Sequence, residues 1–235
     1  MQYRRIMLKL SGEALGENGW LFDHGKIMRV AEVIKSVADS GTQVGVLIGG
    51  GNLWRGRHGA SAGMDAVRAD QMGMLGTLMN CLVMQDALSQ LGQPSQVFSA
   101  LHMPGVCSNY RRDLADDALT KDRVALFGGG LGNPFFTTDT AVTLRALELR
   151  ADVLLLAKNV DGVYTADPRE DPSAVLIRDI SYREAIKRGL KVMDMAAFLM
   201  CAEQNLPQVR VFGLDQPDNI KRVLDGETLG TTLHP

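Results

Sequence analysis

Two glycine-rich turns hold the residue types that could bind a phosphate group. Residues 128–139 read Gly-Gly-Gly-Leu-Gly-Asn-Pro-Phe-Phe-Thr-Thr-Asp, between an apolar run at 124–127 and a helical pattern at 140–150. Glycine lets the backbone approach a ligand because no Cβ stands in the way, and free amides at a helix start attract anions. The stretch therefore favours a phosphate site, although a tight turn with an N-cap explains it equally well when it is judged alone.

The second turn, at 49–51, follows an apolar run at 43–48, and Arg55 comes four residues after it. Ligands of parallel α/β sheets lie beyond the carboxyl ends of the strands, so two such turns favour one shared site. The Arg55 guanidinium offers a planar fork for phosphate oxygens, and a solvated surface arginine is the alternative. Neither turn matches the P-loop or the dinucleotide-binding pattern, since Trp54 and Asn133 stand where the latter needs glycine.

Three further residues have both a chemical and a structural interpretation. Lys9 lies near the end of the apolar strand 5–10, where an ammonium needs an anion unless it faces solvent; taken alone, the solvent-facing lysine is favoured. Asp70, near the start of the helical pattern 65–91, would accept ribose hydroxyls or only compensate the helix dipole. Tyr164 would stack on a base or cover an apolar edge.

The surrounding patterns predict an α/β fold in a single domain, 1–235. The nearly continuous apolar run at 152–157 is typical of a parallel sheet covered on both faces. Methionines at positions 72, 74, 79 and 84 of the long helix indicate core packing or an oligomer seam. The expected strands are 5–10, 43–48, 96–99, 124–127, 152–157 and 208–212, and the expected helices are 26–39, 65–91, 111–120, 140–150, 180–188, 194–205 and 218–224.

Composition narrows the class of protein. A net charge of −2, with no dense basic run, provides no general field for nucleic acid. No apolar run approaches a membrane span, and the N-terminus does not read as a secretion signal. The three cysteines are isolated and odd in number, which indicates reduced thiols and a cytoplasmic location. The four histidines lack metal-ligand spacing, so no protein-bound metal is expected.

Taken together, the motifs resemble the bacterial uridylate (UMP) kinases of the amino acid kinase superfamily, essentially from end to end. The resemblance implies a three-layer αβα sandwich around a mainly parallel, twisted sheet. Some of these motifs have counterparts across the superfamily, whereas the 132–139 motif together with Asp70 is specific to the uridylate kinases. The motifs are Lys9-Leu-Ser-Gly-Glu-Ala-Leu15, Gly49-Gly-Gly-Asn-Leu-Trp-Arg-Gly56, Asp70-Gln-Met-Gly-Met-Leu75, Gly132-Asn-Pro-Phe-Phe-Thr-Thr-Asp139, Val160-Asp-Gly-Val-Tyr-Thr-Ala-Asp-Pro168 and Val192-Met-Asp-Met-Ala-Ala-Phe198.

The same resemblance implies residue roles. Lys9 and Arg55 would be catalytic, Mg²⁺ would bind mainly through the ATP phosphates, and the enzyme would be a homohexamer activated by GTP and inhibited by UTP. The GTP-linked segment would be Gly16, Glu17, Asn18, Gly19, Trp20 and Leu21. ATP would contact Lys9, Leu10, Ser11, Gly12, Gly51, Arg55, Asn159, Tyr164 and Asp167. UMP would contact Gly50, Asp70, Leu131, Gly132, Asn133, Pro134, Phe135, Phe136, Thr137 and Thr138.

The sequence departs from the family pattern at three places. Leu131 stands where threonine is common, Lys158-Asn159 replaces a more usual Thr-Lys pair, and Trp54 replaces phenylalanine. Two other functions are compatible with part of the pattern. A kinase of the same fold acting on acetylglutamate, aspartate or carbamate would not need Asp70 or Thr138. A binding-only member, such as a nucleotide sensor or a metal-storage shell, would be expected to lose Lys9 or Arg55.

Overall fold

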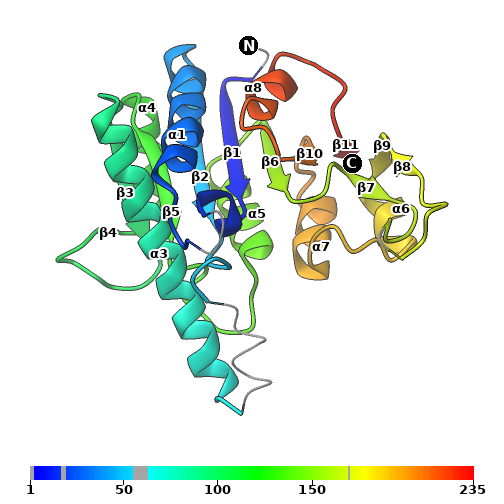
Figure 1. The fold of residues 1–235 in the computed structure, drawn as a ribbon, viewed down its shortest axis with the longest axis horizontal. Helices are drawn as coiled ribbons and strands as arrows, with labels where there is room; N and C mark the ends of the chain where they lie inside the picture. The colour runs from blue at the N-terminus through cyan, green and yellow to red at the C-terminus, as the bar shows by residue number, and fades with distance from the viewer. Residues whose placement is uncertain (1–2, 17–19, 55–62, 169) are drawn as a thin grey trace.

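The computed structural model describes residues 3–16, 20–54, 63–168 and 170–235. In these residues nine strands form one sheet with the order β4-β3-β5-β2-β1-β6-β10-β11-β9 (Figure 1). Every neighbouring pair is parallel except β10 and β11, which are antiparallel. The strands are β1 (Arg5–Leu10), β2 (Gln43–Ile48), β3 (Ser95–Ser99), β4 (Ser108–Asn109), β5 (Val124–Gly128), β6 (Val153–Lys158), β9 (Asp179–Ser181), β10 (Val209–Gly213) and β11 (Thr231–His234).

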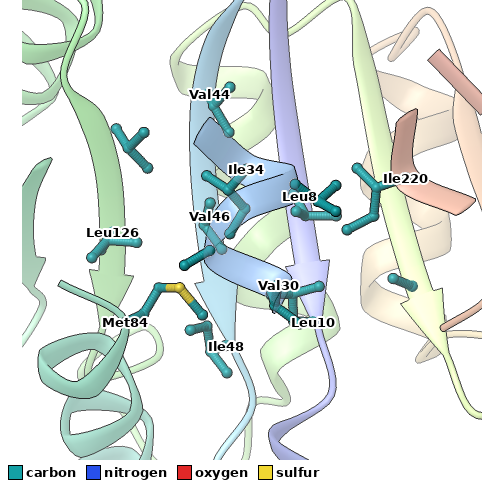
Figure 2. Packing of buried hydrophobic residues seen from close by; sticks show 14 of the residues in the cluster. Leu8, Leu10, Val30, Ile34, Val44, Val46, Ile48, Met84, Leu126 and Ile220 are labelled. Carbon is teal, nitrogen blue, oxygen red and sulfur yellow. The ribbon is translucent and has the colours of Figure 1, made fainter. Parts of the chain in front are cut away.

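Helices cover both faces of the sheet, so the expected αβα sandwich is confirmed. One buried cluster joins the sheet to α1 (His24–Asp39), α3 (Ala66–Gln90) and α8 (Asn219–Leu224). Figure 2 shows Leu10 of β1 beside Val30 of α1 in this cluster. The opposite cluster joins the sheet to α4 (Arg112–Thr120), α5 (Thr138–Glu148), α6 (Tyr182–Lys187) and α7 (Met195–Glu203). Because side chains alternate along a strand, Met7 belongs to the second cluster while Leu8 belongs to the first.

Side chains that accept hydrogen bonds from the first helical turn set where several helices begin. Asp23 accepts from the Lys26 amide at the start of α1, and Asp65 accepts from the Arg68 amide at the start of α3. These starts agree with the predicted helices to within two residues. None of the helices in the described ranges is long and apolar enough to cross a membrane.

The prediction was wrong near the C-terminus, where a single helix was expected over 180–188. Asp179–Ser181 instead form β9, which pairs with β11, and α6 starts only at Tyr182. Ser181 caps this helix by accepting a hydrogen bond from the Glu184 amide. Strands this short have little periodicity of their own, and their pairing partners lie more than 50 residues away in the chain. Other short elements were also missed: the 3₁₀ helix Gly12–Leu15, the strands β4 and β11, and the hairpin of β7 (Val163–Tyr164) with β8 (Leu176–Ile177).

Candidate functional site

A buried cluster of three charges lies at the carboxyl edge of the sheet. Asp139, in the first turn of α5, has one carboxylate oxygen 3.1 Å from Lys9 Nζ and the other 3.0 Å from Lys158 Nζ. Lys9 extends from β1 and Lys158 from the adjacent strand β6, both toward the face that α5 covers. The exposed fractions of the Lys9 and Asp139 side chains are only 12% and 13%. The interpretation of Lys9 as a solvent-facing residue is therefore wrong.

The cluster carries a net positive charge in a poorly hydrated place. Burial by itself raises the pKa of Asp139, but the ammonium groups of Lys9 and Lys158 outweigh it and hold that pKa below its ordinary value. Burial lowers the pKa of Lys158, opposed by the attraction of Asp139 and reinforced by repulsion from Lys9. Lys158 Nζ also donates to the Val192 carbonyl, which fixes the direction of its side chain. An anion arriving here would meet two oriented ammonium groups and one carboxylate.

The first turn of α5 is capped internally, which corrects the expectation of free amides there. The Thr137 hydroxyl oxygen accepts hydrogen bonds from the amides of Asp139, at 3.0 Å, and Thr140, at 3.4 Å. Asp194, which also caps α7, accepts from the Thr140 amide at 3.1 Å and from the Thr140 hydroxyl at 2.6 Å. It accepts a further hydrogen bond from the Thr137 hydroxyl. An anion would therefore have to bind elsewhere than at these two amides.

A narrow cavity of about 150 Å³ is lined by most of the residues that were predicted to contact UMP. Thr138 lines it and is followed in the chain by Asp139 of the charged cluster. Trp54 forms part of the wall and donates its indole N–H to the Ala69 carbonyl at 2.8 Å. The cavity is lined by Gly50, Trp54, Asp70, Gly73, Met74, Thr77, Gly130, Leu131, Asn133, Phe136, Thr137 and Thr138.

Asp70 already has a partner across this cavity. Its Oδ2 atom accepts a hydrogen bond of 2.8 Å from the Phe135 amide. Phe135 has a left-handed backbone, with φ of 69°, and its side chain is 72% exposed. Such a conformation is uncommon for a bulky residue, so the Asp70 hydrogen bond has a direct part in holding the 133–136 segment. A ligand that binds Asp70 would have to displace this amide or bind beside it.

The glycines of the two turns are required for different physical reasons. A Cβ at Gly50 would lie 2.7 Å from the Gly73 carbonyl oxygen, because the turn packs directly on the backbone of α3. Gly73 and Gly76 of α3 therefore allow the close approach of the turn at 49–51 of the same chain. In the other turn Gly129, Gly130 and Gly132 have φ of 77°, 57° and 78°, a region that other residues seldom adopt.

A larger cavity, of about 730 Å³, is lined by Lys158. It lies over the carboxyl ends of β6 and β10 and is bordered by Lys26, Arg29 and Val30 of α1. Asn159 lines it and donates its amide to the Glu13 carboxylate. The remaining lining residues are Glu13, Ala14, Lys158, Val160, Asp161, Pro168, Gly213, Leu214, Asp215, Gln216 and Pro217.

Two residues predicted to share a site with Asn159 line a third cavity instead. Tyr164 and Asp167 border a space of about 490 Å³ between residues 160–170 and 188–192. The Tyr164 hydroxyl donates to Asp161 at 2.7 Å, which raises the pKa of Tyr164. Val160 and Pro168 line both the second and the third cavity, so the two spaces are adjacent.

The other predicted residues lie in several places. Leu10 is fully buried at the end of β1, Ser11 immediately precedes the 3₁₀ helix that begins at Gly12 without a capping hydrogen bond from its side chain, and Gly51 follows β2. Gly132 and Pro134 belong to the second turn. Gly16 ends the 3₁₀ helix, and Trp20 and Leu21 are 75% and 50% exposed. Arg55, Glu17, Asn18 and Gly19 lie outside the described residues.

Asp139 and Lys158 have roles in the charged cluster that the sequence patterns did not indicate. In the sequence Asp139 stands only as the last residue of the 132–139 motif, and Lys158 only as a departure from a family pattern. The sequence did contain a signal for Lys158, because it is the last residue of an apolar parallel strand and Lys9 lies one residue before the end of another. Asp194 had no such signal, since its partners Thr137 and Thr140 lie 57 and 54 residues away.

Comparison with known proteins agrees with this architecture. Residues 4–213 match the amino acid kinase family. The chain is 46% identical over 234 residues to the uridylate kinase of Bacteroides thetaiotaomicron, with 99% of both chains covered. The corresponding protein of Parabacteroides distasonis is 47% identical, again with 99% of both covered.

Solved structures give the same result. The UMP kinase from Bacillus anthracis superimposes with a TM-score of 0.94 at 36% identity, covering 99% of this chain and 96% of that one. The UMP kinase from Ureaplasma parvum gives 0.93 at 34% identity, with both chains fully covered. By its sequence match, its sheet and its helical layers, the chain belongs to the amino acid kinase family.

Proposed function

We propose that this protein is a UMP kinase, which transfers the γ-phosphoryl group of ATP to UMP and yields UDP and ADP for pyrimidine nucleotide (CTP/UTP) biosynthesis. One observation carries the proposal. Lys158 of the charged cluster lines the large cavity, and Thr138, the neighbour of Asp139 in the chain, lines the narrow cavity. Two polyanionic substrates that meet head to head need this arrangement, with cations at the meeting point. The names of the similar proteins, uridylate kinase and UMP kinase, support the choice of substrate.

In this proposal UMP occupies the narrow cavity. Asp70 holds the ribose hydroxyls, Thr138 reads the base, and the turn from Leu131 to Phe136 encloses the phosphate and uracil. The present volume of about 150 Å³ is below the roughly 300 Å³ of an ordinary ligand pocket. The 133–136 segment therefore moves outward when UMP enters, and the hydrogen bond between Asp70 and the Phe135 amide is exchanged for bonds to the ligand.

ATP approaches from the side of the large cavity. Its phosphates lie against Lys9, Ser11 and Gly12 after β1, with Gly51 and Arg55 completing the enclosure. Asn159 contacts the nucleotide in the large cavity, and Tyr164 and Asp167 contact it from the adjoining space. Residues 1–235 act as one catalytic domain.

The reaction needs little acid–base chemistry from the protein. The phosphate of UMP is already ionised near neutral pH, so catalysis consists of positioning two anions and stabilising charge on the transferring group. Lys9, Lys158 and Arg55 supply the positive charge. Asp139 orients the two lysine side chains toward one point without neutralising both.

The fold family also implies Mg²⁺. In the part of the chain that the structure describes, no three His, Cys, Asp or Glu side chains are grouped to hold a metal ion. This fits a cation that binds mainly through phosphate oxygens and water, as Mg²⁺ does in many kinases. The bound cation would neutralise phosphate charge, while Lys9 and Lys158 act on the transferring group.

The assembly and its control are part of the proposal. Met72, Leu75 and Met79 are 39%, 43% and 49% exposed and follow one another along one side of α3, which we assign to a subunit contact in a homohexamer. GTP would activate the enzyme through the segment 16–21, UTP would inhibit it, and the enzyme would act in the cytoplasm. Sedimentation of the purified protein tests the assembly, and a monomer would contradict it.

An assay that couples ADP release to a visible signal tests the function. ATP, Mg²⁺ and one acceptor at a time (UMP, CMP, acetylglutamate or aspartate) should give rapid turnover only with UMP. Turnover with an amino acid would instead assign another kinase activity of this fold. A complete lack of turnover with every acceptor would favour a binding-only protein.

A further inference from the structure

Two buried asparagine side chains join the segments that would hold the two substrates. Asn80, in α3, is fully buried, and its amide nitrogen donates to the Gly49 carbonyl at 2.6 Å and to Asn52 Oδ1 at 2.9 Å. The Asn52 amide returns a hydrogen bond of 3.2 Å to Asn80 Oδ1 and donates to the Leu21 carbonyl at 3.0 Å. This closed pair, called here the amide pair, consists of Asn52 and Asn80.

The loop after β1 rests on the same group. A Cβ at Gly12 would lie 2.2 Å from the Gly49 carbonyl oxygen and 2.4 Å from Asn52 Oδ1, so the two loops are in direct backbone contact. The Gly49 amide donates to the Leu10 carbonyl at 2.9 Å. Four segments of the chain thus converge on one neutral, hydrogen-bonded group: residues 10–12, residues 20–21, the turn 49–52 and the middle of α3.

We infer that the amide pair is a positioning device for phosphoryl transfer, in which Asn80 fixes the turn 49–52 against the loop 10–12. The inference rests on the proposed function, because in that function loop 10–12 binds ATP phosphates and Gly50 lies against UMP. Transfer requires the attacking and leaving oxygens to be roughly in line, and a displacement of about 1 Å can reduce the rate about 10²-fold. Neutral amides suit this task, because they add no net charge, so that the lysines determine the local electrostatic field.

Asn80→Ala tests the inference, with Cys81→Ala as the matched control. Cys81 is the next residue of α3 and is also fully buried, but it packs in the apolar cluster. Both variants should lower the melting temperature. At a temperature where each is folded, we expect Asn80→Ala to lower kcat about 10²-fold, with KM for UMP and ATP changed less than threefold. Cys81→Ala should leave kcat unchanged.

Asn52→Ala is the second variant, because Asn52 is only partly buried and its loss is tolerated better by the fold. It should reproduce the loss of kcat, and the double variant should lose no more than Asn80→Ala alone, since the two amides act as a unit. A kcat within threefold of the parent in Asn80→Ala or Asn52→Ala would overturn the inference. Additive losses in the double variant would do the same.

Amide hydrogen exchange separates this inference from the proposed function. In Asn80→Ala, peptides covering residues 10–16 and 49–54 should exchange at least tenfold faster than in Cys81→Ala. If the parent chain releases no ADP with any acceptor, the proposed function fails, and this exchange measurement still decides whether the amide pair holds the two loops. Equal exchange in the two variants would refute the amide pair as a positioning device.

Discussion

The two glycine-rich turns look alike in the sequence but have different surroundings. The turn at 49–51 packs on the backbone of α3 and on the neutral amides of Asn52 and Asn80. The turn at 128–133 has left-handed glycines and leads into α5, where Asp139 joins two lysines. One turn is held by close packing without charge, and the other precedes the charged cluster. In the proposed enzyme the first provides position and the second provides charge.

If the charged cluster performs the chemistry, Lys9→Ala should cause the largest loss of turnover. We expect turnover to fall about 10²–10³-fold, which is the loss seen in other enzymes when a group that stabilises transition-state charge is removed. The melting temperature should change much less, because Lys9 contributes charge rather than core packing. Steady-state kinetics and thermal unfolding measure the two effects. Lys187→Ala, at an exposed position, is the control, and normal turnover in Lys9→Ala would remove Lys9 from the mechanism.

Asp139→Asn should come next, with a loss of turnover of about 10²-fold and a clear loss of stability, because two buried ammonium groups would then repel each other. The variant also has a pH signature. Asp139 raises the pKa of Lys158 against the effect of burial, so its removal lowers that pKa further. Activity that needs protonated Lys158 is lost as the pH rises through this pKa. The alkaline limb of the kcat profile should therefore move to lower pH, and an unmoved limb would exclude Lys158 as the titrating group.

Substitutions of one glycine in each turn sharpen the comparison. Gly130 has φ of 57°, and the nearest atom to an added Cβ lies 3.5 Å away, so only the backbone conformation is demanding. Asparagine tolerates this conformation better than alanine, and Gly130→Asn should be more stable than Gly130→Ala. At Gly50 space is the limit, so Gly50→Ala should be more stable than Gly50→Asn.

Thermal and denaturant unfolding of these four variants should show differences of about 1–3 kcal/mol. The same order of alanine and asparagine at both positions would mean that the two turns require glycine for one common reason.

Asp70→Ala tests the hydrogen bond from the Phe135 amide to Asp70, which joins the 133–136 segment to α3. The effect of this substitution should be the smallest. The substitution removes the acceptor for the Phe135 amide and the proposed acceptor for ribose hydroxyls. We expect KM for UMP to rise about tenfold, equivalent to about 1.4 kcal/mol, with kcat within threefold of the parent. Asp86→Ala, at an exposed position of the same helix, is the control. A kcat loss without a KM change would place Asp70 in the positioning of the reaction instead.

Local patterns were sufficient for the predicted strands and the long helices. Apolar runs such as 152–157, which corresponds to β6 in the structure, and the stripe of α1 identify their elements because a buried strand or an amphipathic helix repeats its apolar residues at a regular spacing. They also indicated that both glycine turns lie at the carboxyl edge of one sheet. Short strands such as β9 and β11 were missed, because they have little periodicity of their own and are defined by pairing with each other and, for β11, with β10.

The sequence by itself determined the α/β class, the glycine turns and the presence of Lys9 in an apolar strand, since each depends on neighbours within a few residues. Only the tertiary structure decided which groups meet. It placed Asp139 between Lys9 and Lys158, Asp194 at the start of α5, and Asn80 beneath the Gly49 carbonyl. These contacts join residues 19 to 130 positions apart, and no local periodicity contains such separations. These long-range contacts are determined by the order of the strands in the sheet and by the packing of the helices on each face.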